Sequence, residues 1–74
     1  MEPMKLSTRN QLAGTVVAIT TGEAMAVVKV RLAGGDTIVT SSITREAVED
    51  LELVEGKEVV VLIKSTEVGL GVED

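Results

Sequence analysis

The chain has 74 residues and a formal net charge of −5, and it contains neither cysteine nor histidine. Because a chain of this length buries only about 60% of its unfolded surface, it needs a further source of stability. The missing residue types rule out disulfides and remove the usual ligands of a structural zinc ion, which leaves oligomerisation. The acidic balance and the absence of Phe, Tyr and Trp argue against nucleic acid as a partner.

The first half of the sequence predicts three strands. Residues 12–21 are rich in β-branched side chains and end at a Thr-Gly-Glu turn signal. Residues 24–33 include an alternation of apolar and cationic side chains, which is typical of a half-buried strand. The turn Gly34-Gly35-Asp36 then leads into a third strand at about residues 37–42.

The second half predicts one short helix followed by two strands. From Thr44 to Leu51 the apolar side chains recur at helical spacing. Residues 57–64 contain a continuous apolar run at 59–63, which suits a strand buried on both faces in a barrel or between subunits. A last strand is expected at residues 66–72, where two glycines indicate a bulge, a close backbone approach or a frayed end. We predict an all-β fold with one short helix, a five-stranded OB-like Greek-key barrel forming a single domain over residues 1–74.

The chain is poorly equipped for catalysis. Without His or Cys it lacks the commonest general base and the strongest nucleophile, and no serine lies in a G-x-S-x-G elbow. Glu46, Glu49, Asp50 and Glu52 lie on or beside the predicted helix at spacings that suit a solvated face. Gly34-Gly35 joins two strands and lacks the spacing of a phosphate loop. We expect a binding protein and not an enzyme.

Membrane insertion and export are not indicated. No apolar run approaches the ~20 residues that a membrane span needs. Residues 1–5 lack the basic-then-apolar order of a secretory signal. The absence of cysteine suits a reducing compartment, although exported bacterial proteins also lack it. We expect a cytoplasmic protein with no membrane partner.

Two short polar segments near the chain ends each combine one cation with small donors. They are Ser7-Thr8-Arg9-Asn10-Gln11 and Ile63-Lys64-Ser65-Thr66, and each adjoins a predicted strand. A tetrahedral oxyanion needs converging N–H and O–H donors with one or two cations, and small side chains let backbone N–H groups approach as well. The segments supply these groups, although cations that only flank strands would have the same pattern.

Thr44 adds a third element at the predicted helix N-terminus. Its hydroxyl is expected to cap the helix, and unpaired amides there favour an anion. Capping alone explains a threonine at this position, yet the neighbouring amides remain able to face a ligand. The candidate oxyanion-binding residues are Ser7, Arg9, Asn10, Thr44, Lys64, Ser65 and Thr66, with no metal ion bound directly.

The order of these motifs resembles that of the molbindins, small Mop-type molybdate-binding proteins with a TOBE-like domain. The resemblance implies an OB-like barrel that exchanges strands between subunits, and a homohexamer, built as a trimer of dimers, whose interfaces hold molybdate or tungstate. The matching stretches are Ser-x-Arg-Asn-Gln-Leu-x-Gly-x-Val from Ser7, Leu-x-Gly-Gly from Leu32, Ile-Thr from Ile43, Leu-x-Leu-x-x-Gly from Leu51 and Ile-Lys-Ser-Thr-x-Val from Ile63.

The resemblance also implies roles for single residues. Arg9 and Lys64 would supply charge, while the hydroxyls of Ser7, Thr44 and Ser65 would fix the tetrahedral geometry. Asn10 would either bind the anion or orient the entry to the strand. The chain departs from the family pattern at Thr8, Val27, Ala47 and the glycine-containing tail, and Ala47 removes one hydroxyl donor.

We therefore predict a protein that binds molybdate or tungstate for storage or homeostasis. Two alternatives remain open. One is a ligand-sensing or regulatory module of a molybdate transporter or regulator. The other is the binding of a molybdenum pterin, against which the absence of aromatic side chains to stack on the ring argues.

Overall fold

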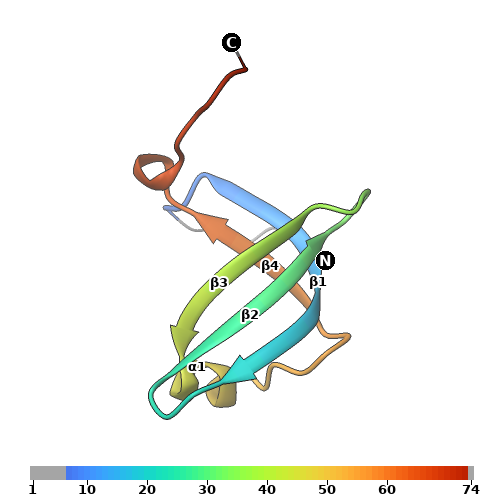
Figure 1. The fold of residues 1–74 in the computed structure, drawn as a ribbon, viewed down its shortest axis with the longest axis vertical. Helices are drawn as coiled ribbons and strands as arrows, with labels where there is room; N and C mark the ends of the chain where they lie inside the picture. The colour runs from blue at the N-terminus through green and yellow to red at the C-terminus, as the bar shows by residue number, and fades with distance from the viewer. Residues whose placement is uncertain (1–6, 74) are drawn as a thin grey trace.

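The computed structural model describes residues 7–73 and contains four strands, one α-helix and one 3₁₀ turn in that part of the chain (Figure 1). The first three strands, the helix and β4 lie within a few residues of their predicted ranges. No helix among the described residues is long and apolar enough to cross a membrane. In chain order the elements are β1 (Asn10–Thr21), β2 (Met25–Leu32), β3 (Ile38–Thr44), α1 (Arg45–Asp50), β4 (Glu58–Ile63) and η1 (Ser65–Glu67).

All four strands form one antiparallel sheet in the order β3-β2-β1-β4. The long strand β1 is shared, because its residues 14–21 pair with β2 and its residues 10–15 pair with β4. Sharing one strand in this way curls the sheet, and Figure 1 shows β4 crossing behind β2 and β3. The result is a mostly-β fold whose curled sheet resembles a barrel.

The interior is built from aliphatic side chains, as the lack of aromatic residues requires. Val16, Val28 and Val30 are buried and form its centre. A β-bulge in β1 between Val16 and Ala18 increases the local bend that closes the sheet over them. The partly buried side chains around this centre are Ile19, Ile43, Val48, Leu53, Val59 and Val61.

Lys57 and two backbone hydrogen bonds fix the loop between α1 and β4. The Lys57 ammonium donates to the carbonyl oxygens of Leu51 at 2.9 Å and Glu52 at 3.2 Å. The Val16 N–H donates to the Lys57 carbonyl at 2.9 Å, and the Gly56 N–H donates to the Val16 carbonyl at 2.8 Å. These bonds set where β4 begins and therefore its register on β1.

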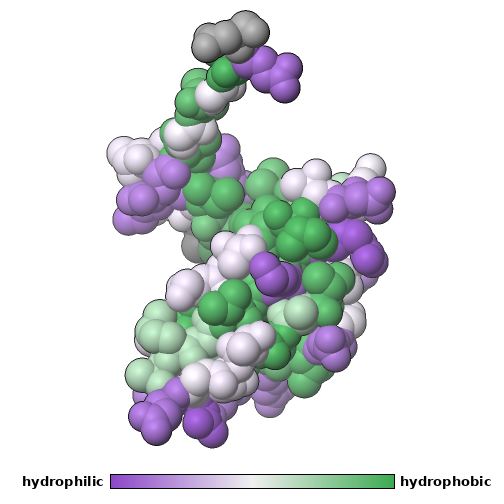
Figure 2. Space-filling view, viewed as in Figure 1, coloured by the Kyte–Doolittle hydropathy of each residue, from purple (hydrophilic) through white to green (hydrophobic). Residues whose placement is uncertain are grey.

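The predicted fifth strand is not formed within the single chain. Ser65–Glu67 is a 3₁₀ turn, and the chain from Val68 onward has no sheet partner among residues 7–73. Leu70 and Val72 are 96% and 93% exposed, and Figure 2 shows this tail standing clear of the sheet with apolar surface in solvent. The two glycines of the tail offer no side chain to pack against a strand. Within residues 7–73 of the single chain, the sheet therefore has four strands and not the predicted five.

The curled sheet is open between its outer strands, β3 and β4. A cavity of about 290 Å³ lies there, and its side chains are aliphatic except for Ser41. Because an outer strand with an apolar face readily accepts another strand, this opening needs a cover. The lining residues are Val16, Val28, Val30, Ser41, Ile43, Leu51, Leu53, Val59, Val60, Val61 and Leu62.

Gly14 lies where β1 pairs with both β2 and β4. A Cβ atom there would lie 2.6 Å from Val30 Cγ1 and 2.8 Å from the Arg31 carbonyl oxygen. We expect Gly14→Ala to lower the free energy of unfolding by about 1–3 kcal/mol, the usual cost of overpacking. Urea denaturation at a fixed protein concentration measures it. Gly35→Ala is the control because a Cβ there meets nothing within 4 Å, and equal losses in both variants would contradict the packing argument.

Candidate functional site

The two polar segments of the sequence lie side by side at one end of the sheet. Asn10 begins β1, Ile63 ends β4, and the two are partners in the antiparallel ladder. Arg9 and Lys64 are the residues just outside this pair, so they lie at the same end of the sheet. The strand register therefore sets Arg9 and Asn10 beside Ile63 and Lys64. The other candidate residues of the two segments, Ser7, Ser65 and Thr66, lie within three residues of this pair along the chain.

Two side-chain amides hold these segments in place. Asn10 Nδ2 donates to the Ile63 carbonyl oxygen at 2.9 Å, across 53 positions in the sequence. Gln11 Nε2 donates to the Thr8 carbonyl oxygen at 3.0 Å. Both amide side chains are half-buried. Gln11 was not among the predicted site residues, and the only signal for it in the sequence is its place in the first polar segment.

The two cations at this end are exposed and available to a ligand. In the described part of the chain the one ion pair joins Arg45 to Glu49 at 3.3 Å, and it involves neither Arg9 nor Lys64. Ser65 and Thr66 are also exposed, in the η1 turn that follows Lys64. Among residues 7–73, this end of the sheet therefore presents two positive charges without an ion-pair partner beside several hydroxyl groups, which suits an anion.

Thr44 lies at the opposite end of the sheet. It pairs with Met25, the first residue of β2, while β1 ends nearby at Thr21. At ~3.3 Å per residue, the 12 residues of β1 extend roughly 36 Å from Asn10 to Thr21 along the strand. One oxyanion cannot contact both ends, so a single chain does not unite Thr44 with Arg9 and Lys64.

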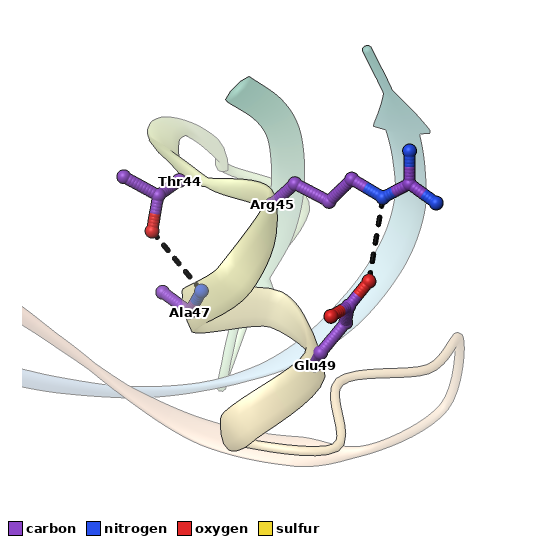
Figure 3. A network of polar contacts seen from close by, with 4 residues as sticks. All are labelled: Thr44, Arg45, Ala47 and Glu49. Carbon is purple, nitrogen blue, oxygen red and sulfur yellow. Dashed lines mark hydrogen bonds and ion pairs between the residues drawn. The ribbon is translucent and has the colours of Figure 1, made fainter. Parts of the chain in front are cut away.

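The surroundings of Thr44 are those of a helix cap. Its Oγ1 accepts the Ala47 N–H at 3.0 Å, and the neighbouring Arg45 Nε donates to Glu49 Oε2 at 3.3 Å (Figure 3). The Thr44 hydroxyl keeps its own proton as a donor. An open cavity of about 560 Å³ beside it is lined by one cation and three carboxylates, so its charge disfavours a dianion unless a further cation is supplied. The lining residues are Glu23, Ala24, Thr44, Arg45, Glu46 and Glu49.

Comparison with known proteins identifies the family. The TOBE domain matches residues 6–70. The chain is 49% identical over 65 residues to molybdenum-pterin-binding protein 3 of Clostridium pasteurianum, covering 88% of this chain and 94% of that protein.

Solved structures agree with this match. A molybdate-binding protein from Sporomusa ovata superposes with a TM-score of 0.87 at 38% identity, covering 93% of this chain and all (100%) of that one. The cytoplasmic molybdate-binding protein ModG, solved with molybdate bound, gives a TM-score of 0.88 at 44% identity, covering 95% of this chain and 49% of ModG. The chain therefore belongs to the TOBE domain family and, within it, to the Mop-type proteins that its motifs resemble.

Proposed function

We propose that this protein binds molybdate or tungstate as the intact oxyanion and serves in its storage or homeostasis in the cytoplasm. The observation that carries the proposal is the pairing of Asn10 with Ile63, which sets Arg9 and Lys64 at one end of the sheet. The relatives named for molybdate or molybdenum binding, and the molybdate held by ModG, support the choice of ligand.

Binding of this kind needs no bond to be made or broken in the ligand. Arg9 and Lys64 offset the two negative charges of the anion, and the hydroxyls of Ser7, Ser65 and Thr66 donate to its oxygens. The net charge of −5 does not prevent this. With a Debye length of ~8 Å at physiological ionic strength, the two nearby cations outweigh carboxylates elsewhere on the surface.

The proposed sites are completed between subunits of a homohexamer built as a trimer of dimers. Because Thr44 lies at the opposite end of the sheet from Asn10 and Ile63 in its own subunit, its hydroxyl joins Arg9 and Lys64 only if it comes from another subunit. Arg9 and Lys64, brought to the site by the other subunit, would also offset the carboxylates that surround Thr44. The acidic cavity beside Thr44 therefore favours a shared site over one within a single chain.

The exposed tail supports strand exchange between subunits. Val68, Leu70 and Val72 alternate with two glycines and a glutamate and are all exposed in the single chain. We propose that this segment supplies the fifth strand by adding to the opening between β3 and β4 of a partner. Burying one Leu or Val side chain stabilises such a contact by about 1.5–3 kcal/mol, and every dimer would gain this twice.

Oxyanion binding is favoured over pterin binding, although several relatives are named for a molybdenum pterin. None of the 74 residues is Phe, Tyr or Trp, so no aromatic side chain can stack on a pterin ring. The apolar cavity between β3 and β4 is about 290 Å³, near the lower limit of ~300 Å³ for small-molecule pockets. The exposed cations match a small dianion instead.

Titration calorimetry with molybdate, tungstate and sulfate at physiological ionic strength tests the proposed function. We expect molybdate and tungstate to bind about tenfold or more tightly than sulfate, a difference of ~1.4 kcal/mol, and a pterin without metal to give no heat. Sulfate binding as tight as that of molybdate would contradict the proposal, since the site would then recognise any tetrahedral dianion.

A further inference from the structure

We infer that Asn10 is a positioning residue of the oxyanion site and not a ligand, and that it acts by orienting the peptide between Ile63 and Lys64. This inference rests on the proposed function. Asn10 Nδ2 donates to the Ile63 carbonyl at 2.9 Å. Its side chain is half-buried, whereas those of Arg9 and Lys64 are exposed.

The backbone of Asn10 faces the same carbonyl as its side chain. The Val16 N–H donates to the Lys57 carbonyl, so Val16 turns its backbone polar groups toward the β4 side. In an antiparallel sheet every second residue of a strand faces the same neighbour. Asn10, six positions earlier on β1, therefore also turns its N–H toward its partner Ile63. The Ile63 carbonyl is held by two donors from one residue.

Fixing this carbonyl also fixes the next N–H group. The described residues contain no cis peptide bond, and in a trans peptide the C=O and the following N–H point in opposite directions. With the Ile63 carbonyl directed toward β1, the Lys64 N–H points away from the sheet. It has no hydrogen-bond acceptor among residues 7–73. Asn10 thus holds a free backbone donor beside the Lys64 ammonium and the Ser65 hydroxyl.

The η1 turn holds the following peptide, between Lys64 and Ser65. The Glu67 N–H donates to the Lys64 carbonyl at 2.9 Å, so the peptides on both sides of the Lys64 Cα are held. Asn10 has little left to offer as a ligand. One of its two Nδ2 hydrogens is used on the Ile63 carbonyl, and the Oδ1 on the same carbon repels an anion, so only the second Nδ2 hydrogen could reach it.

The test is Asn10→Ala in the full-length protein, with molybdate as the probe. We expect the affinity for molybdate to fall about 5- to 30-fold, the effect of one misplaced hydrogen bond, with oligomer size retained in native mass spectrometry. Amide NMR gives a second readout. In the unmodified protein the Lys64 amide signal should shift when molybdate is added, and in Asn10→Ala this shift should be lost or strongly reduced.

Gln11→Ala is the matched control. It removes an amide of the same kind, but one that holds the Thr8 carbonyl at 3.0 Å, so the Lys64 amide should still respond to molybdate. Asn10→Ala with unchanged affinity, or with weakened affinity and a normal Lys64 response, would overturn the inference. Failure of the unmodified protein to bind molybdate would reject the proposed function itself and, with it, this role of Asn10.

Discussion

Lys64→Met should bind molybdate about 30- to 100-fold more weakly than the unmodified protein, and Arg9→Met should lose a similar factor. A charge-assisted hydrogen bond contributes about 1.5–3 kcal/mol, and its loss also removes a positive charge facing the dianion. Both side chains are exposed, and neither forms an ion pair among residues 7–73. The variants should therefore fold and assemble normally, and calorimetry can measure binding alone.

Lys29→Met and Arg31→Met are the matched controls for these two variants. Each removes one positive charge from an exposed position on β2, where Lys29, among residues 7–73, donates only to the Thr40 hydroxyl, at 3.2 Å. At physiological ionic strength, charges farther away than the ~8 Å Debye length are largely screened, so we expect a change of less than about twofold in affinity. Equal losses in the site variants and the controls would mean that overall charge, and not a built site, attracts the anion.

Leu70→Asp should break the oligomer into smaller species. In the single chain Leu70 is 96% exposed, so the substitution costs the isolated subunit almost nothing. In a strand-exchanged dimer the same position is buried, and an unpaired carboxylate there costs several kcal/mol. Native mass spectrometry or light scattering, with subunits of 7.8 kDa, reports the change. Molybdate affinity should fall with assembly, because each site would lose the partner's donors.

Val54→Asp is the control for the tail. Val54 is also exposed, at 61%, but lies in the loop between α1 and β4. We expect this variant to keep the oligomer size and the molybdate affinity of the unmodified protein. If Leu70→Asp assembles as well as Val54→Asp, the tail does not dock on a partner and the proposed strand exchange is wrong.

The sequence predicted the elements of the fold well because their signals are local. Alternation defined β2, helical spacing defined α1, and a continuous apolar run defined β4. The predicted fifth strand does not form in the single chain, because a strand needs a partner to pair with. Residues 66–72 carry strand-like spacing, but no edge within the single chain pairs with them. Propensity alone cannot say whether the partner lies in the same chain or in another.

The residues of the candidate site could be predicted from the sequence, but their arrangement in space could not. The two polar segments were recognisable from their residue types, but only the register of β1 on β4 places Arg9 beside Lys64. The role of Asn10 was open because its partner, Ile63, lies 53 positions away. Thr44 joined the candidate set through its place at the predicted helix N-terminus, and the length of β1 shows that it lies at the other end of the sheet.

Native mass spectrometry of the full chain, recorded with and without molybdate, tests the central claim that the sites are shared between subunits. The predicted result is a hexamer of the 7.8 kDa subunit that carries bound oxyanion, together with a smaller Leu70→Asp species that carries none. A monomer that binds one molybdate with the affinity of the unmodified protein would contradict the claim, because it would show that one chain completes the site alone.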